Sequence, residues 1–396
     1  MSSRIFKKGL ELKHAVAGML AESYHSPLVE QIKADGFRYE AGRLTLHLAR
    51  EFGFCYGVDR AVDYAYQARA RFPDRRVILA GEIIHNPHVN QRLRDLGIQF
   101  LGDPDAALDA LVPTDVVIVP AFGLPITAQQ QLEARGCTIV DTTCGSVLNV
   151  WKNVKRYAGD GLTALIHGKA WHEETRATAS QALQLPGGRY LVVLNRIEAL
   201  AVCDYIRHGG DREAFRERFG PAASPGFDPD QDLARIGLAN QTTMLMSESM
   251  AIGELFRDAM RDRYGEAELA GRFRSFDTIC SATQDRQDAI VDLLKEQPLD
   301  LAVVIGGYNS SNTCNLARIC AERVPTYHIA GPDDLLSSTQ IRHRPVGRKE
   351  ETVTTGWLPP TGAVRIGLTS GASTPDNLIG IAVEHLTRFC APIVEA

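Results

Sequence analysis

The stretch LAVVIGGYNSSNTCNLARI, residues 301–319, contains the pattern that decides the fold. Its first residues are apolar and rich in valine, a polar loop follows, and a helix is expected after the loop. A buried strand that leads through a polar turn into a helix is the repeating element of α/β domains with parallel sheets.

Short β-rich runs alternate with helical patterns along most of the chain. The other runs are VILA (77–80), VVIVP (116–120), LTALIH (162–167), YLVVL (190–194) and VRIGLT (364–369). This alternation predicts an α/β protein. Residues 1–44 are expected to form a mostly polar, helical N-terminal extension. Residues 204–235, which are charged and rich in Gly and Pro, are expected to form an inserted loop or short subdomain.

Composition narrows the class of protein. With 396 residues, 44% of them hydrophobic, the chain can bury large cores and should form two or three domains. The net charge of −5 argues against a broad basic surface, so we expect no nucleic acid partner. No apolar run reaches the roughly 18 residues of a membrane span, and we recognise no secretory signal or transit peptide. We therefore expect a cytoplasmic protein with small ligands and no membrane contact.

Three of the eight cysteines stand at the starts of predicted helices. They are Cys55 in GFCYGVDRAV, Cys144 in DTTC and Cys280 in DTIC. The dipole of a helix stabilises a thiolate at this position, and the thiolate is the form that binds metal. Three such groups could supply three of the four ligands of a zinc or iron–sulfur site, with the fourth position open.

Ordinary packing remains an alternative for these cysteines. A free cysteine is among the most buried residue types, and none of the three lies in a C-x-x-C pair. Cysteine usage of this kind suits a reducing compartment. The other five cysteines are expected to be packing residues: Cys137, Cys203, Cys314, Cys320 and Cys390. Of these five assignments, that of Cys314 has the weakest support, because Cys314 adjoins a polar motif.

Small polar residues follow other predicted strands. They occur in NSSN, SGASTPD and NQTT and include Ser310, Ser311, Asn312, Ser370, Ser373, Gln241, Thr242 and Thr243. Hydroxyl and amide groups at helix starts suit a phosphate-like anion, although each one alone can be an ordinary helix cap. The chain has neither the G-x-x-x-x-G-K-[ST] nor the G-x-G-x-x-G motif, which excludes the usual P-loop and dinucleotide folds.

Two histidine segments complete the set of polar candidates. His85 precedes Asn86, a candidate helix cap, and Pro87, a candidate first helical residue. His172 and Glu174 follow the strand LTALIH and form a possible proton-transfer pair. His88 and His167 are expected to be exposed to solvent.

The motifs in combination resemble a known enzyme family. GFCYGVDRAV, GEIIHNPHV, DTTC, HGKAWHEE, NQTT, DTIC, NSSN and SGASTPD occur in this order over roughly residues 45 to 380. Their combination resembles the 4-hydroxy-3-methylbut-2-enyl diphosphate reductases, which catalyse the last step of the methylerythritol phosphate pathway. The N-terminal stretch and the insertion resemble the branch of this family found in cyanobacteria and chloroplasts.

The resemblance implies a cloverleaf of three α/β domains around a central iron–sulfur cluster. The expected limits are 1–44 for the N-terminal extension, 45–143 for the first domain, 144–279 for the second domain with insertion 204–235, and 280–396 for the third domain and C-terminal segment. The cluster would be one 4Fe–4S cluster per chain, held by Cys55, Cys144 and Cys280.

The resemblance also implies roles for the polar residues. Glu174 matches the essential acid, and Thr242 matches a threonine near the substrate hydroxyl. The residues that match diphosphate contacts, or lie beside them, are His85, His172, Thr243, Ser310, Ser311, Asn312 and Ser373. One departure is Phe122 in PAFGLP, where many bacterial members have a histidine that contacts phosphate. The cyanobacterial and plant branch shares this change.

The implied reaction is the reductive dehydroxylation of 4-hydroxy-3-methylbut-2-enyl diphosphate to isopentenyl and dimethylallyl diphosphate. In it, an iron without a cysteine ligand acts as a Lewis acid, Glu174 supplies protons, and ferredoxin is the expected electron donor. Three alternatives stay open: an iron–sulfur hydro-lyase, which needs no electrons; a non-catalytic iron–sulfur or zinc sensor, which has no need of Glu174; and a plain zinc protein, which contains no inorganic sulfide.

Overall fold

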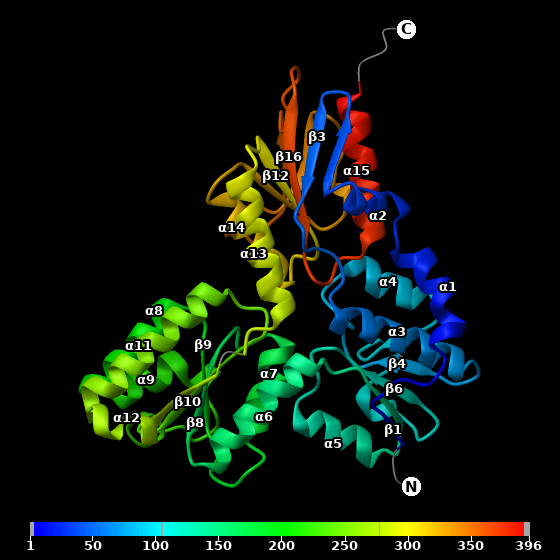
Figure 1. Cartoon of the computed structure of the whole chain (residues 1–396). Coiled ribbons are helices and arrows are strands. Elements are labelled where there is room, and N and C mark those ends of the chain that lie inside the picture. Colours follow the sequence, from blue (N-terminus) through cyan, green and yellow to red (C-terminus); the bar gives the residue numbers. More distant parts are fainter. Residues whose placement is uncertain (1–3, 104–105, 277, 392–396) are drawn as a thin grey trace. The chain divides into compact units, whose positions relative to one another are not determined.

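The computed structural model describes residues 4–103, 106–276 and 278–391, and its contacts divide the chain into two units. The first unit comprises Met1–Ile5 and Leu108–Cys280, and the second comprises Phe6–Ala107 and Ser281–Ala396. Each unit is therefore assembled from two separate stretches of the chain. In Figure 1 the two stretches of the second unit are coloured blue to cyan and yellow to red. The three domain limits expected from the sequence stay a prediction.

The central sheet of the first unit has four parallel strands in the order β11–β10–β8–β9. The strands are β8 (Thr163–His167), β9 (Tyr190–Val193), β10 (Ile236–Asn240) and β11 (Phe273–Ser275). Every residue of β8 and β10 is buried, as expected for parallel strands covered on both faces. The expected strands at 162–167 and 190–194 are thus confirmed.

Helices cover both faces of this sheet (Figure 1). On one face, α8 (Arg196–His208) and α11 (Met246–Tyr264) pack in a cluster with Leu165. On the other face, α6 (Gly145–Gly159) packs in a cluster with Ala164. The neighbouring residues Ala164 and Leu165 belong to different clusters because successive side chains of a strand point to opposite faces of the sheet.

The first unit contains further helices and strands outside this sheet. They are η1 (Leu108–Ala110), β6 (Val116–Val119), α5 (Ile126–Ala134), β7 (Thr138–Asp141), α7 (Glu173–Ala182), α9 (Arg212–Phe219), η2 (Gly220–Ala222), α10 (Pro229–Asp232) and α12 (Glu266–Arg272). Strands β6 and β7 pair in parallel. The segment 204–235 forms short helices, and its Phe215, Phe219 and Phe227 belong to the same apolar cluster as α8 and α11.

The main sheet of the second unit has five strands in the order β13–β12–β16–β3–β2. The strands are β2 (Arg38–Ala41), β3 (Leu44–Leu48), β12 (Leu301–Ile305), β13 (Thr326–Ile329) and β16 (Val364–Ser370). Only β2 runs antiparallel to its neighbour among these strands. The strand expected at 301–307 is confirmed as β12, and the strand expected at 364–369 as β16.

The helices of the second unit lie on both faces of this sheet. One apolar cluster joins it to α2 (Pro27–Ala34) and α15 (Asp376–Cys390), and another joins it to α13 (Ser281–Glu296) and α14 (Ser311–Ala321). The remaining elements are α1 (Lys13–Tyr24), α3 (Tyr56–Arg71), β4 (Val77–Leu79), α4 (Pro87–Asp95), β5 (Gln99–Phe100), η3 (Pro332–Asp334), β14 (Gln340–His343) and β15 (Thr352–Thr355). The short strand β1 (Ile5–Phe6) lies where the first stretch of the first unit ends and that of the second unit begins.

The first 44 residues are helical in part, as expected. Helices α1 and α2 lie in this stretch, but it also contains strand β2, which pairs with β3 in the main sheet of the second unit. Within the described ranges, no helix is both long and apolar enough to cross a membrane.

His328 on β13 is expected to make the stability of the fold depend on pH. Its side chain is 3% exposed, and its Nε2 donates a hydrogen bond to the carbonyl oxygen of Gly306 at 2.9 Å. Burial, reinforced by the positive charge of Arg344, lowers the pKa of His328 to about 4. The unfolded chain, with an ordinary histidine pKa near 6.5, therefore binds a proton at a higher pH than the folded chain does.

We expect the resulting contribution to stability to be complete above pH 6.5 and to be lost as the pH falls toward 4, by up to about 3 kcal/mol. His328→Gln keeps a donor but cannot titrate. Between pH 7 and 5 its unfolding free energy, from denaturant titration, should fall about 2 kcal/mol less than that of the wild type. His208→Gln, at a position on the surface, is the control. Equal losses in wild type and His328→Gln would contradict the assignment.

Candidate active site

The three candidate cysteines occupy equivalent local positions. Cys55 and Cys144 are the N-cap residues of α3 and α6, each with extended backbone angles, and Cys280 directly precedes α13. All three are half-buried and free of disulfide bonds. The predicted position of each thiol at a helix start is thus confirmed. Thiol donors at such positions fit an iron–sulfur or zinc centre, because the helix N-terminus favours the thiolate.

In the second unit, the turn that carries Cys55 is fixed by the loop that precedes α15. Gly53 has a φ of +78° and donates its N–H to Ser370 Oγ at 2.9 Å. A side chain at Gly53 would collide with the carboxylate of Asp376. The N–H of Cys55 donates to the carbonyl oxygen of Ala372 at 3.2 Å. Glycine is therefore needed at position 53 for both its backbone angle and its lack of a side chain.

The same loop also contacts the start of α14. The N–H of Ala372 donates to Asn312 Oδ1 at 3.0 Å, so one residue links the Cys55 turn to the NSSN motif. Ser310 caps α14 by accepting the N–H of Thr313 at 3.3 Å. Asn312 is 1% exposed, and its Nδ2 has no hydrogen-bond partner among the described residues. A buried donor without a partner is costly, so this amide suits a bound acceptor such as a phosphate oxygen.

His85 and Ser373 lie at the same part of the second unit. Ser373 Oγ donates to the carbonyl oxygen of His85 at 3.4 Å, and His85 Nδ1 is 2.8 Å from Glu82 Oε2. Asn86 caps α4 by accepting the N–H groups of His88 and Val89, and Pro87 is the first helical residue. The expected helix start after His85 is confirmed. His85, Ser310, Asn312 and Ser373 thus all belong to the unit that contains Cys55.

In the first unit, a buried carboxylate is held at the start of α7. Glu174 is 2% exposed, and its two carboxylate oxygens accept hydrogen bonds from Thr242, one from the backbone N–H at 2.6 Å and one from Oγ1 at 3.0 Å. His172 caps α7, because its Nδ1 accepts the N–H of Glu174 at 3.1 Å. The structure therefore brings together the predicted acid, threonine and histidine.

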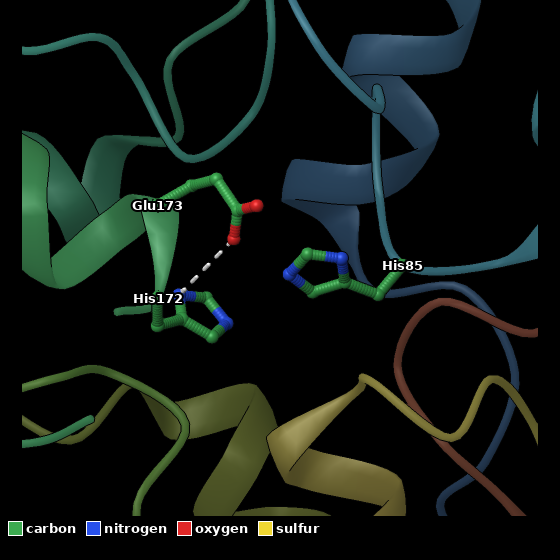
Figure 2. Close-up of side chains that lie close together, drawn as sticks. All are labelled: His85, His172 and Glu173. Carbon is green, nitrogen blue, oxygen red and sulfur yellow. Dashed lines mark ion pairs between the residues drawn. The ribbon is translucent and has the colours of Figure 1, made fainter. Parts of the chain in front are cut away.

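The neighbouring glutamate is placed quite differently. The side chain of Glu173 is 56% exposed, and its Oε2 lies 4.0 Å from His172 Nδ1. Figure 2 shows this contact as a dashed line between His172 and Glu173. Burial thus distinguishes the two consecutive acids, since only Glu174 is enclosed.

The NQTT loop also connects to the third cysteine. The N–H of Cys280 donates to the carbonyl oxygen of Thr242 at 3.2 Å. Gln241 Oε1 accepts hydrogen bonds from the N–H of Lys169 and from Thr175 Oγ1, both at 3.1 Å, while its Nε2 donates to Thr243 Oγ1 at 3.0 Å. Gln241 therefore fixes the loop that carries Thr242 and Thr243. The sequence marked the NQTT motif as a candidate site, but it did not indicate that Gln241 holds this loop in place.

Phe122 contacts His172 in the first unit. The two ring centroids are 5.5 Å apart and the ring planes meet at 81°, which is an edge-to-face arrangement. The carbonyl oxygen of the preceding residue, Ala121, accepts the N–H of Cys144 at 3.0 Å. The phenyl ring thus orients a neighbouring histidine by packing, where a histidine in its place would offer a hydrogen bond.

Phe122→Leu should release this orientation of His172. If His172 contacts the substrate, as the family resemblance implies, we expect KM to rise about two- to tenfold with kcat nearly unchanged, in line with the usual strength of an aromatic pair. Steady-state kinetics of wild type and variant measure this. An unchanged KM would show that the ring contact does not affect binding.

The two other histidines singled out in the sequence, His88 and His167, are less exposed than expected. The expected exposure of His167 is wrong, because it is fully buried and its Nδ1 lies 2.8 Å from Ser249 Oγ. His88 is half-buried.

Four of the other cysteines are buried, as expected for packing residues: Cys137, Cys203, Cys320 and Cys390. Burial raises the pKa values of the Cys203 and Cys320 thiols to about 12, so both stay protonated.

Sequence reasoning missed Arg344, which contacts the start of α14. Its Nη2 donates to the carbonyl oxygen of Tyr308 at 2.6 Å and lies 3.1 Å from the half-buried thiol of Cys314. Its guanidinium also lies over the Tyr308 ring. No motif surrounds Arg344, so nothing in the sequence indicates this contact.

The fold and the site define a class of protein: α/β proteins with thiols at helix starts, polar donors suited to an anion, and a buried carboxylate. The chain belongs to the LytB protein family, whose model matches residues 46–387.

Individual relatives and structures agree with this family. The chain is 50% identical, over 96% of its length and 93% of the relative, to the 4-hydroxy-3-methylbut-2-enyl diphosphate reductase of Thermosynechococcus vestitus. It is also 50% identical to the 4-hydroxy-3-methylbut-2-enyl diphosphate reductase of Gloeobacter violaceus, over 97% of its own length and 92% of the relative. One solved structure that matches is that of (E)-4-hydroxy-3-methyl-but-2-enyl diphosphate reductase, the terminal enzyme of the non-mevalonate pathway. The match covers 87% of the present chain and 99% of the chain in that structure, at 26% identity and with a TM-score of 0.51.

A second structure supports the fold alone. It is the E-1-hydroxy-2-methyl-but-2-enyl-4-diphosphate reductase from Plasmodium falciparum, which is 20% identical to the chain and has a TM-score of 0.63 over 88% of each chain.

Proposed function

We propose that the chain reductively dehydroxylates 4-hydroxy-3-methylbut-2-enyl diphosphate to isopentenyl and dimethylallyl diphosphate, the last step of the methylerythritol phosphate pathway. The observation that carries the proposal is Glu174, a buried carboxylate held by both donors of Thr242, whose own carbonyl accepts the N–H of Cys280. Relatives that are half identical over nearly the whole chain are named as this reductase, which supports the proposal.

The proposed cofactor is one 4Fe–4S cluster per chain, with Cys55, Cys144 and Cys280 as ligands. Their shared position at helix starts supports this set, since soft thiolates are the usual ligands of iron–sulfur clusters. When bound, the cluster supplies electrons and an iron without a cysteine ligand that can polarise the substrate hydroxyl.

The residues proposed to hold the diphosphate are polar groups at helix starts. Asn312 Nδ2 is a buried donor without a partner in the described part of the chain, and Ser310 lies at the N-terminus of α14, where a helix favours anions. Binding the diphosphate would orient the reacting end of the substrate. The full proposed set is His85, His172, Thr243, Ser310, Ser311, Asn312 and Ser373.

Glu174 is the proposed proton donor. The reaction consumes two electrons and two protons, one proton to release the hydroxyl as water and one to complete the allylic carbon. A carboxyl group excluded from water and oriented by two hydrogen bonds is suited to proton transfer. Thr242 Oγ1, 3.0 Å from Glu174 Oε2, is placed to relay a proton.

A ferredoxin is the proposed electron donor, and the cytoplasm the proposed location. The relatives from Thermosynechococcus vestitus and Gloeobacter violaceus support the assignment to the cyanobacterial branch, from which the choice of donor follows.

The proposal is tested by anaerobic assays of the purified protein with the hydroxylated diphosphate, with and without dithionite. We expect both products only when the reductant is present. Substrate loss without reductant would instead support an iron–sulfur hydro-lyase. A protein that contains iron and sulfide but never consumes substrate would support a sensor, and a colourless zinc protein would overturn the cofactor as well.

A further inference from the structure

Arg286 is a buried cation in the second turn of α13. Its side chain is 3% exposed. None of the ion pairs that the structure shows between described residues includes it. Arginine stays protonated in proteins, so the folded chain encloses a full positive charge here. Such a charge is costly to bury unless an anion offsets it.

The guanidinium is directed at the turn that carries Cys55. Its Nη2 donates to the carbonyl oxygen of Gly53 at 2.8 Å and lies 3.5 Å from that of Phe52. Its Nη1 donates to the carbonyl oxygen of Ala282 at 2.8 Å, in the first turn of its own helix. Its Nε is buried and has no partner within the ranges that the structure covers. Carbonyl oxygens satisfy part of its hydrogen bonding but supply no negative charge.

The position of this charge suggests what offsets it. Gly53 and Cys55 are separated by at most about 7 Å of chain, so the guanidinium lies within roughly 10 Å of the Cys55 backbone. Ala282, whose carbonyl it also contacts, follows Cys280 by two residues. One buried cation is therefore attached to the backbone beside two of the three candidate ligands.

We propose that Arg286 is the counter-charge of the iron–sulfur cluster and favours its reduced state, an inference that rests on the proposed function. A 4Fe–4S cluster with three thiolate ligands is an anion and gains a further negative charge on reduction. A fixed buried cation therefore stabilises the reduced cluster more than the oxidised one. Arg286 also fixes the Gly53 carbonyl, so it is a positioning residue and not a catalytic one.

Coulomb's law gives the size of the effect. With an effective dielectric constant of about 20, one unit charge at about 10 Å changes a one-electron equilibrium on the order of tenfold. Removing the charge should therefore lower the ratio of reduced to oxidised cluster about tenfold at a fixed potential, which is about 59 mV for one electron.

Two substitutions separate the charge from the hydrogen bonds. Arg286→Gln keeps a donor for the Gly53 carbonyl and loses the charge, whereas Arg286→Lys keeps the charge and loses the forked geometry. Redox titration of the anaerobic holoenzymes, followed by electron paramagnetic resonance, measures the ratio of reduced to oxidised cluster, and iron analysis measures loading. We expect a roughly tenfold fall for Arg286→Gln and less than about threefold for Arg286→Lys. Lys295→Met, on the exposed side of the same helix, should change neither the ratio of reduced to oxidised cluster nor the iron content.

Each outcome decides the matter. Similar shifts in Arg286→Gln and Arg286→Lys, or no shift in Arg286→Gln with full iron content, would overturn the electrostatic role. Loss of the cluster in Arg286→Gln alone would support it, whereas loss in both variants would show a purely structural role. A wild-type protein without iron and sulfide would instead overturn the proposed function, so the two failures are distinguishable.

Discussion

Glu174→Gln is expected to retain the cluster and bind substrate but to lose turnover by about 10²- to 10⁴-fold, the usual range for removing a general acid. Glutamine has nearly the same shape and can still accept the hydrogen bond from Thr242 N–H, 2.6 Å away in the wild type. It cannot hold or deliver a proton. Anaerobic steady-state kinetics with dithionite measure the rate, and iron analysis measures the cluster.

The neighbouring residue supplies the control. Glu173→Gln removes an identical charge from a side chain that is 56% exposed, so we expect a rate within about twofold of wild type. Near-normal turnover in Glu174→Gln would remove Glu174 from the proton path. Equal losses in both variants would point to a general effect of charge at the start of α7.

Cys144→Ser is expected to lose both the iron–sulfur cluster and the activity. Serine has the size of cysteine, but its hydroxyl is a hard ligand that is not deprotonated as a thiol is at a helix N-terminus. The visible absorption spectrum, iron and acid-labile sulfide of the anaerobically purified variant measure the loss.

Cys314→Ser is the matched control, because Cys314 is also half-buried and lies just after a helix start. Its thiol contacts Arg344 and the Tyr308 carbonyl and is not among the proposed ligands. We expect full iron content in this variant. An unchanged spectrum in Cys144→Ser would refute the proposed set of three ligands.

The features that the sequence predicted correctly depend on local chemistry. Strands such as β12 and β16 were recognisable because buried parallel strands read as continuous apolar runs. The helix starts at Asn86 and Ser310 were recognisable because short polar side chains cap helices. The cysteines could be grouped because each precedes a helix.

The features that it could not predict depend on contacts between distant residues. Arg286 and Arg344 contact carbonyl oxygens of Gly53 and Tyr308, and any backbone offers such acceptors, so no pattern marks the partner. The burial of His167 follows from the packing of β8 between two layers of helices. The pairing of β3 with β16 likewise joins two stretches of sequence far apart in the chain.

The most direct test of the account is whether substrate reaches an iron that lacks a cysteine ligand. The measurement is the electron paramagnetic resonance spectrum of dithionite-reduced, anaerobically purified Glu174→Gln, with and without the hydroxylated diphosphate. The account predicts the signal of a reduced 4Fe–4S cluster that changes on addition of substrate, because binding alters the environment of the open iron. The absence of such a signal, or a signal that substrate leaves unchanged, would contradict it.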